Sequence, residues 1–292
     1  MAKLLLGKEV TDALNANLQT RTAALREKGI VPTLGIIRVG ADPSDLSYEK
    51  GATKRAELVG VEVKKFELPA DATKEDVLAV IDQVNADDSI HGVLMFRPLP
   101  KHLKADQNEI CYRLAPQKDV DGMPHLSNAG VFEGLNDLGF APCTPSACME
   151  ILDYYGIDCK GKNAVVIGRS LVVGKPAAMM LMGKNATVTV CHTKTVNTAE
   201  ICKQADILVS AAGVLNSLTA DYVRPGQVVI DVSINWDAEK PNAKGGKGAI
   251  AGDAKFDEVE PIVEAITPVP GGVGSVTTSV LMKHVVEAAE RA

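Results

Sequence analysis

Aromatic residues are scarce in this chain. Phe, Trp and Tyr together make up 4% of its 292 residues, and there is a single Trp. Val, Ile, Leu and Ala must therefore fill the core, which suits the buried strands of a parallel α/β sheet. The hydrophobic fraction of 46% is enough for a substantial core, and the length allows one large or two medium domains.

Metal-binding cysteine pairs and membrane-spanning runs are also missing. None of the six cysteines belongs to a C-x-x-C pair, and no Cys/His grouping has zinc spacing, so we expect reduced, packed thiols and no metal. The N-terminal MAKLLLGKEV is too short for a secretory signal, and no later apolar run approaches membrane length. We expect a cytoplasmic protein with no membrane partner. The net charge of −6 argues against a nucleic-acid partner.

Extended and helical patterns alternate from the start of the chain, which predicts a parallel sheet. Helical spacing covers residues 8–28, 45–59 and 73–85, and apolar extended runs cover 33–40, 61–68 and 91–96. Thr73 and Asp76 have the spacing of a capping box at the start of the third helix.

A second alternating series follows residue 143. Its extended runs cover 164–168, 187–191, 206–211 and 227–233, and the Lys- and Gly-rich segment 239–253 reads as a loop. The sequence thus predicts two α/β domains, one of residues 1–143 and one of 144–274. The last helix, 275–292, carries apolar residues around much of its circumference, and we expect it to pack back on the first domain.

The segment AVVIGRSLVVGKPAAMML predicts a nucleotide-binding turn. A β-branched run stops at Gly168, and Pro176 lies in the first turn of a helix. Strand, glycine turn and helix start together direct backbone N–H groups at a phosphate. The turn is not a standard G-x-G-x-x-G, because Ser170 and Val173 hold the second and third glycine positions and Gly174 comes one later. An ordinary strand-to-helix turn is the alternative.

The end of the following strand favours NADP as the cofactor. A fold selective for NAD places an acidic residue there to bind the ribose hydroxyls. Here the strand ends with His192, Thr193 and Lys194, and Arg169 lies in the preceding turn. These donors can accept a 2′-phosphate, although NAD is not excluded.

The run ITPVPGGVGSVTTSVLMKH, taken with YEKGATKR, RPLP, KDVDG, PCTP, GRSLVVGKP and IDVSIN, resembles the methylenetetrahydrofolate dehydrogenase/cyclohydrolase family over nearly the whole chain. The resemblance implies a folate-binding catalytic domain (1–143 and 275–292), a Rossmann NAD(P)-binding domain (144–274), a folate cleft between them and a homodimer. It implies two reactions of one-carbon metabolism. Hydride passes from 5,10-methylenetetrahydrofolate to the nicotinamide, and water then opens the methenyl product to 10-formyltetrahydrofolate.

The resemblance also implies site residues. Tyr48 matches a tyrosine that packs on the folate ring, and Asp121 matches a carboxylate that binds the pterin; each has a structural alternative, as a half-buried helix residue and a turn residue before Gly122. Tyr48, Asp121 and Lys54 are the expected catalytic residues. The expected substrate contacts are Tyr48, Phe96, Pro98, Leu99, Asp121, Pro270, Gly271 and Gly272. The expected cofactor contacts are Gly168, Arg169, Ser170, Gly174, Lys175, Pro176, His192, Thr193, Ile234, Gly274 and Thr277.

Two positions depart from the family pattern. The family has Tyr-x-x-x-Lys, with the lysine as main cyclohydrolase catalyst, whereas Ala52 is the fourth residue after Tyr48. Lys50 and Lys54 lie two and six residues on, which is about 200° or 240° around a helix. The missing lysine would lie at about 40°, so neither can take its place without a shift in helix phase or a bulge.

The second departure lies after the 91–96 strand. The family reads Val-Gln-Leu-Pro-Leu-Pro, and its glutamine assists the lysine. Here the run is Met95 to Pro100, with Phe96 in place of the glutamine and Arg97, a poor base, in place of the first leucine.

Hydride transfer needs positioning, whereas hydrolysis needs a group that moves a proton. We therefore expect a dehydrogenase with weak or lost cyclohydrolase activity. The alternatives are a fully bifunctional enzyme, a non-catalytic folate or nucleotide-binding protein, and an unrelated Rossmann dehydrogenase.

Overall fold

The computed structural model describes residues 1–122, 125–135, 137–242 and 245–292, which form two compact units. The six-stranded unit contains Met1–Thr11 and Thr144–Thr277, and the three-stranded unit contains Asp12–Cys143 and Thr278–Ala292. The prediction of a two-domain α/β fold is confirmed. The division differs from the expected ranges at the N-terminus, because β1 (Lys3–Leu4) pairs with β11 (Ala265–Ile266) of the six-stranded unit.

The large sheet of the six-stranded unit is parallel throughout and has the order β1-β11-β8-β7-β5-β6. Its other strands are β5 (Asn163–Ile167), β6 (Thr187–Cys191), β7 (Ile207–Ser210) and β8 (Val228–Asp231). The chain moves from β5 to one neighbour, β6, and then back to the other, β7. Such a reversal opens a ligand-binding crevice at the carboxyl ends of the strands beside β5.

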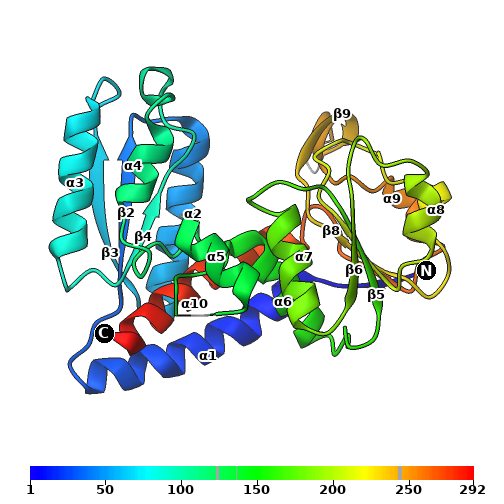
Figure 1. Ribbon diagram of the computed structural model, residues 1–292, viewed down its shortest axis with the longest axis horizontal. Helices are drawn as coiled ribbons and strands as arrows, with labels where there is room; N and C mark the ends of the chain where they lie inside the picture. The colour runs from blue at the N-terminus through cyan, green and yellow to red at the C-terminus, as the bar shows by residue number, and fades with distance from the viewer. Residues whose placement is uncertain (123–124, 136, 243–244) are drawn as a thin grey trace. The chain divides into compact units, whose positions relative to one another are not determined.

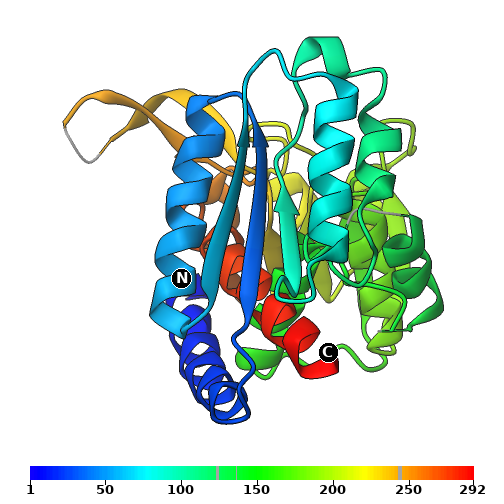
Figure 2. The same cartoon turned by 90° about the vertical axis from the view of Figure 1, so that its left-hand side faces the viewer.

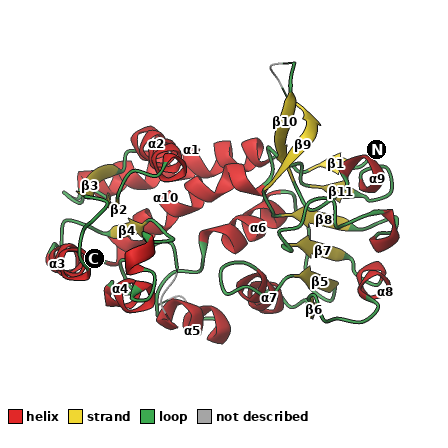
Figure 3. Ribbon diagram, turned by 90° about the horizontal axis from the view of Figure 1, so that it is seen from above, coloured by secondary structure: helices red, strands yellow, loops and turns green. Residues whose placement is uncertain are grey.

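Helices cover both faces of this sheet (Figure 3). α6 (Cys143–Tyr154) and α7 (Gly174–Gly183) lie over one face, and α8 (Thr198–Lys203) and α9 (Phe256–Val259) lie over the other. A 3-10 turn, η2, spans Ala220–Tyr222. The core on the α8 side is built from small and branched side chains such as Val165, Leu208 and Val229, as the shortage of aromatics predicts.

The segment predicted as a loop over 239–253 forms much of an antiparallel hairpin instead. Its strands are β9 (Asn235–Pro241) and β10 (Lys247–Ala251), and residues 243–244 lie outside the described chain. The ring of Trp236 packs so closely over Gly248 that a Cβ there would lie 2.6 Å from it. Lys240 donates to the carbonyl oxygen of Ile250 at 2.8 Å. Cross-strand contacts of this kind overcome the weak strand preference of Lys and Gly.

The three-stranded unit has a parallel sheet of order β3-β2-β4. The strands are β2 (Thr33–Val39), β3 (Glu62–Leu68) and β4 (Gly92–Met95), close to the predicted runs. Every residue of β2 is buried, because α2 (Pro43–Val59) and α3 (Lys74–Ala86) lie on opposite faces of the sheet (Figure 2). The chain again leaves the central strand toward one neighbour and returns to the other, so a second crevice is expected at the carboxyl ends of β2 and β4.

The remaining helices of the three-stranded unit complete its packing (Figure 1). They are α1 (Gly7–Glu27), η1 (Lys101–Leu103), α4 (Gln107–Arg113), α5 (His125–Glu133) and α10 (Val273–Arg291). The division between the units falls within α1 and α10. Ser279 of α10 donates to Asn15 of α1 at 3.1 Å. The predicted capping box at the start of α3 is confirmed, with Thr73 as the N-cap residue.

All six cysteines are free and buried, as predicted. Within residues 1–122, 125–135, 137–242 and 245–292, no helix is both long and apolar enough to cross a membrane.

Candidate active site

The turn between β5 and α7 lies at the reversal point of the large sheet. Gly168 has φ of 122°, and a Cβ at this position would lie 2.3 Å from the carbonyl oxygen of Ala211, which follows β7. A Cβ at Gly174 would lie 2.2 Å from the carbonyl oxygen of Gly168. Glycine is therefore required at both positions, and the backbone of the turn is left accessible to a ligand.

The predicted residues of this turn lie together at the start of α7. The Ser170 hydroxyl accepts hydrogen bonds from the N–H groups of Val173 (3.1 Å) and Gly174 (3.4 Å). Arg169, Ser170 and Lys175 are exposed, whereas Gly174 and Pro176 are buried and can offer only backbone. Exposed donors beside a helix N-terminus suit a pyrophosphate, so the turn fits the phosphates of a dinucleotide.

The end of β6 lies next to this turn, because Gly168 N–H donates to the carbonyl oxygen of Cys191 at 2.9 Å. His192 accepts a hydrogen bond from Lys194 N–H through Nδ1, and its own N–H donates to the Thr195 hydroxyl. These contacts fold residues 192–195 into a compact turn and leave Thr193 and Lys194 exposed. Thr195 was not predicted; its signal is a hydroxyl four residues after the end of β6.

A cavity of about 280 Å³ in the six-stranded unit brings together most of the expected residues from the C-terminal motif. Its lining includes Ile234, Pro270, Gly271, Gly272 and Gly274. Thr277 is not among the lining residues; its hydroxyl donates to the carbonyl oxygen of Gly274 at 3.2 Å.

Sequence reasoning missed the buried carboxylate that organises this edge of the sheet. Asp253 is fully buried and accepts hydrogen bonds from six donors. They are the hydroxyls of Ser210 and Ser233, the amide of Asn235, and the N–H groups of Ala212, Gly213 and Val214. Asp253 thus ties the segment after β7 to the segment after β8, where Ile234 lies. Its only signal in the sequence is an Asp after a Gly in a segment predicted as loop.

Asp231 lies beside Asp253 at the end of β8. Its carboxylate accepts hydrogen bonds from the N–H groups of Asp253 and Ala254. Burial, with the neighbouring Asp253 charge as a smaller cause, raises the pKa of Asp231 to about 6. A Cβ at Gly252 would overlap the Asp231 carboxylate.

In the three-stranded unit, the rings of Tyr48 and Phe96 meet at the carboxyl edge of the sheet. Their centroids are 5.9 Å apart and their planes are 85° from parallel. Tyr48 is half-buried on α2, and Phe96 follows β4. Pro98 is exposed and Leu99 is buried a few residues further on.

The phase of α2 is set by a buried ion pair. Glu49 accepts from Arg38 Nε of β2 at 2.9 Å, with both side chains less than 10% exposed. Ala52 lies on the same buried face and is fully buried, whereas Lys50 and Lys54 are exposed. The expected catalytic residue Lys54 therefore points away from the buried face that holds Ala52, which agrees with the helical-phase argument.

Asp121 lies near the end of β4 because the KDVDG segment runs alongside that strand. Val93 forms a parallel bridge with Asp119, so two residues further on Met95 lies beside Asp121. Arg97 Nη2 donates to Asp121 Oδ2 at 3.0 Å. Burial raises the pKa of Asp121, and the Arg97 charge opposes that rise.

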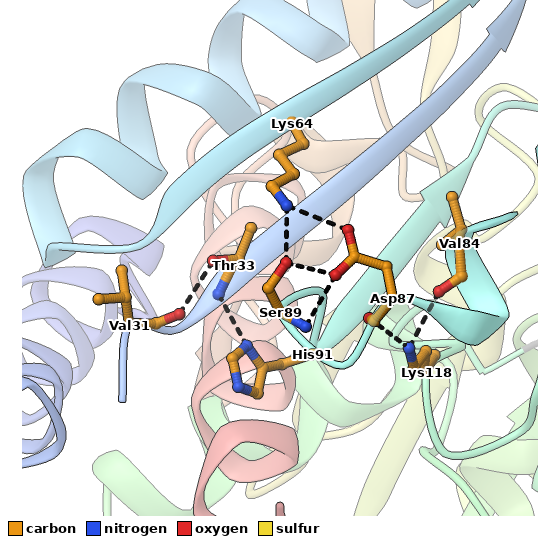
Figure 4. Close-up of polar contacts among 8 residues, drawn as sticks. All are labelled: Val31, Thr33, Lys64, Val84, Asp87, Ser89, His91 and Lys118. Carbon is orange, nitrogen blue, oxygen red and sulfur yellow. Dashed lines mark hydrogen bonds and ion pairs between the residues drawn. The ribbon is translucent and has the colours of Figure 1, made fainter. Parts of the chain in front are cut away.

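Lys118, the first residue of KDVDG, has a structural role at the end of α3. Its ammonium donates to the carbonyl oxygens of Val84 and Asp87, at 2.9 and 2.8 Å, where α3 ends (Figure 4). Asp87 also pairs with Lys64. The Lys118 backbone lies beside Val93 of β4, whose N–H donates to the Lys118 carbonyl oxygen, and Phe96 comes about 10 Å of strand further along. Lys118 therefore cannot replace the lysine missing at position 52.

No group of three or more His, Cys, Asp or Glu side chains that could hold a metal ion occurs among the described residues.

Two family models match the chain. Residues 5–121 match the catalytic domain of tetrahydrofolate dehydrogenase/cyclohydrolase, and residues 142–292 match its NAD(P)-binding domain. The bifunctional protein FolD of Carboxydothermus hydrogenoformans is 53% identical over 290 residues, which cover 99% of this chain and 98% of that protein.

Solved structures give the same result. The bifunctional enzyme FolD (methylenetetrahydrofolate dehydrogenase/cyclohydrolase) from Campylobacter jejuni has a TM-score of 0.91 and 38% identity, covering 100% of this chain and 99% of that one. The Trypanosoma brucei methylenetetrahydrofolate dehydrogenase-cyclohydrolase, complexed with NADP cofactor and inhibitor, has a TM-score of 0.89 and 33% identity, covering 99% and 98%. The resemblance inferred from the motifs is confirmed: the chain is an enzyme that belongs to the tetrahydrofolate dehydrogenase/cyclohydrolase family.

Proposed function

We propose that this enzyme oxidises 5,10-methylenetetrahydrofolate to 5,10-methenyltetrahydrofolate with a nicotinamide cofactor. The supporting observation is the turn at Gly168 and Gly174, whose bare backbone and exposed donors fit a dinucleotide, in a chain of this family. The cofactor, when bound, supplies the hydride acceptor. Hydride transfer requires no acid or base from the protein, so the residues act by binding and orienting.

The proposed roles follow the two units. In the three-stranded unit, Tyr48 packs on the folate ring, Phe96, Pro98 and Leu99 line its site, and Asp121 accepts from the amino-pyrimidinone edge. In the six-stranded unit, the residues expected to contact the cofactor are the proposed cofactor contacts. The Pro270–Gly272 segment of the same unit is proposed to contact the folate. Lys54 is no longer proposed as a catalyst, because it is exposed on the other face of α2.

NADP is the proposed cofactor. Arg169, Thr193 and Lys194 are exposed around the end of β6, and no carboxylate follows that strand to bind a ribose 2′-hydroxyl. The Trypanosoma brucei relative was solved with NADP. Comparison of kcat/KM for NADP and NAD tests this choice, and a preference for NAD would reject it.

Two forms of the proposal differ in whether the enzyme also catalyses the second reaction, hydrolysis of the methenyl product. The relatives from Carboxydothermus hydrogenoformans and Campylobacter jejuni are named bifunctional, which favours an enzyme that also hydrolyses the methenyl product. One local observation favours a dehydrogenase without cyclohydrolase activity: the side chains of Ala52 and Phe96 cannot transfer a proton. The comparisons cover the whole chain, and we therefore propose the bifunctional enzyme, with the monofunctional dehydrogenase as the second candidate.

A time course separates the two. With 5,10-methylenetetrahydrofolate and NADP, the reduced cofactor and the methenyl product are followed separately. Consumption of the methenyl product faster than in buffer supports the bifunctional enzyme. Accumulation in step with reduced cofactor, with decay at the uncatalysed rate, supports the dehydrogenase alone. Failure to reduce either NADP or NAD would reject both.

A cytoplasmic homodimer completes the proposal. β6 has one neighbour, β5, in the sheet order, and its Val190 is 37% exposed. An apolar residue on an edge strand suits a subunit interface. Light scattering at the concentration used for activity would reject this part if it gave the mass of one chain.

A further inference from the structure

The carboxylate of Asp121 is already ion-paired in this protein. Arg97 Nη2 lies 3.0 Å from Asp121 Oδ2, and the two side chains are 21% and 26% exposed. The family pattern has a leucine at the position of Arg97, so this pair is a departure from that pattern. A small cavity lies beside the pair and is also lined by Met95, Cys111 and Leu114.

The guanidinium of Arg97 has hydrogen-bonding capacity left over. A guanidinium has five N–H donors in a fixed plane. Of these, the described residues use the Nη2 contact to Asp121. The pair therefore presents unused donors next to a carboxylate whose second oxygen can still accept.

A 2-amino-4-oxopyrimidine edge presents the complementary order of groups. Along that edge lie a carbonyl oxygen, a ring N–H and an amino group, that is, one acceptor followed by two donors. Arg97 beside Asp121 offers a donor followed by acceptors. Charge-assisted hydrogen bonds of this kind combine strength with a fixed direction.

We propose that Arg97 is a specificity-determining residue that donates to the 4-oxo group of the folate ring while Asp121 accepts from the adjacent ring N–H and amino group. This inference rests on the proposed folate activity and deepens it. A 2,4-diaminopyrimidine edge presents an amino group where Arg97 requires an acceptor, and a ring nitrogen without a proton where Asp121 requires a donor. The pair therefore rejects that edge, because two donors face each other in a half-buried site.

Arg97 also keeps Asp121 in the accepting state. Burial raises the pKa of Asp121, and the nearest charge that lowers it is Arg97. The other titratable groups facing the pair are Asp119, Cys111 and Cys143. Burial raises the pKa of both thiols and keeps them neutral. The Cys143 thiol lowers the pKa of Asp121 by a hydrogen bond, as a smaller cause than Arg97, and Asp119 is an acid that carries no positive charge. Loss of Arg97 therefore moves protonation of Asp121 to higher pH.

Direct binding tests the proposal without turnover. Calorimetry measures the Kd of tetrahydrofolate and of a matched 2,4-diamino analogue for the wild-type chain and for Arg97→Leu, Arg97→Lys and Arg113→Leu. We expect the wild type to prefer the 4-oxo ligand by about tenfold or more. Arg97→Leu should have a smaller preference, which is the part that Asp121 contributes by accepting from the ring N–H. Arg97→Lys should lie between the two. Arg113→Leu is the matched control, because it breaks another Arg–Asp pair of the same unit, with Asp82, and should keep the wild-type ratio.

The outcomes are distinguishable. An unchanged ratio of the two Kd values in Arg97→Leu overturns the role of Arg97 and leaves the proposed function standing. Absence of binding of both ligands to the wild type overturns the proposed function and this inference together. Because the readout is a ratio, a general weakening of the fold in a variant does not imitate the expected result. As the pH falls, binding of tetrahydrofolate should also begin to weaken at a higher pH in Arg97→Leu than in the wild type.

Discussion

The rings of Tyr48 and Phe96 meet edge to face, with centroids 5.9 Å apart and planes 85° from parallel. Aromatic pairs prefer this geometry, which contributes about 0.5–1.5 kcal/mol beyond the area buried. An apolar ring therefore stands where the family pattern has a glutamine. The surroundings of Tyr48 suit the packing of a flat ring better than the activation of water.

Restoring the two family residues tests this interpretation. Ala52→Lys combined with Phe96→Gln should raise the rate of methenyl hydrolysis by about tenfold or more, because a positioned proton-transfer group contributes at least that much. The rate is measured from the decay of the methenyl absorbance, with buffer decay subtracted. No change in the double variant would count against the account.

Two lysines on α2 supply the control for that experiment. Lys50→Ala and Lys54→Ala should leave wild-type hydrolysis and dehydrogenase rates as they are, because both side chains are exposed away from the buried face. A loss of hydrolysis in Lys54→Ala would identify Lys54 as the catalyst. Ala52 is fully buried, so the stability of each Ala52→Lys protein is measured alongside its rate.

The glycines of the β5–α7 turn give a second prediction. Gly168→Ala places a methyl group against the carbonyl oxygen of Ala211 and forces φ of 122° on a residue with a side chain. We expect the KM for NADP to rise by about tenfold or more, because the backbone of the turn must shift and small misplacements are costly. Gly183→Ala is the matched control on α7, where a Cβ meets nothing within 4 Å. It should be neutral or stabilise the protein by up to about 1 kcal/mol.

The sequence predicted those strands, helices and turns whose formation depends on residues close together in the chain. The strands β2, β5 and β7 and the helices α1 and α3 lie close to their predicted ranges, because their apolar spacing matches one buried face. The turn at Gly168 was predicted from the same local order of strand, glycine and helix. The short strands β1 and β11 were not predicted, because a strand of two residues is too short to show an alternating apolar pattern.

The missed features of the site depend on distant residues. Asp253 is more than 30 residues from Ser210 along the chain, and nothing local to Asp253 indicates that six donors converge on it. The pairing of Arg97 with Asp121 arises because the KDVDG segment runs beside β4, a tertiary relationship without local periodicity. The Lys- and Gly-rich composition of segment 239–253 predicts a loop, whereas the structure has the hairpin of β9 and β10, because the cross-strand packing of Trp236 outweighs that composition.

Asp253 gives a third prediction. Asp253→Asn replaces an acceptor oxygen with an amino group that must face N–H and hydroxyl donors, which leaves buried groups unpaired at about 1–3 kcal/mol each. We expect a lower free energy of unfolding and a higher KM for NADP, because the segments after β7 and β8 lose their common anchor. Asp158→Asn is the control: Asp158 accepts one backbone N–H, from Lys160, at an exposed turn. Equal effects of the two substitutions would contradict the anchoring role.

His284 gives a prediction about pH. It is 6% exposed on α10, its Nδ1 lies 2.8 Å from the carbonyl oxygen of Val120, and its ring stacks on Phe140. Burial is the main cause that lowers its pKa from 6.5 to about 4. Above pH 6.5 both the folded and the unfolded chain carry a neutral ring at this position, so His284 adds no pH dependence.

As the pH falls from 6.5 to about 4, the unfolded chain binds a proton at His284, whereas the folded chain does not. The stability of the folded state therefore falls through this window, by at most about 3 kcal/mol. Asp231 acts in the opposite direction: its pKa is raised to about 6, so the folded chain binds that proton first and gains stability as the pH falls. Comparison of the wild type with His284→Asn removes the Asp231 contribution, because both proteins share it. Urea unfolding at pH values on both sides of the window should show a steeper loss in the wild type, whereas equal losses would mean that His284 is protonated in the folded chain.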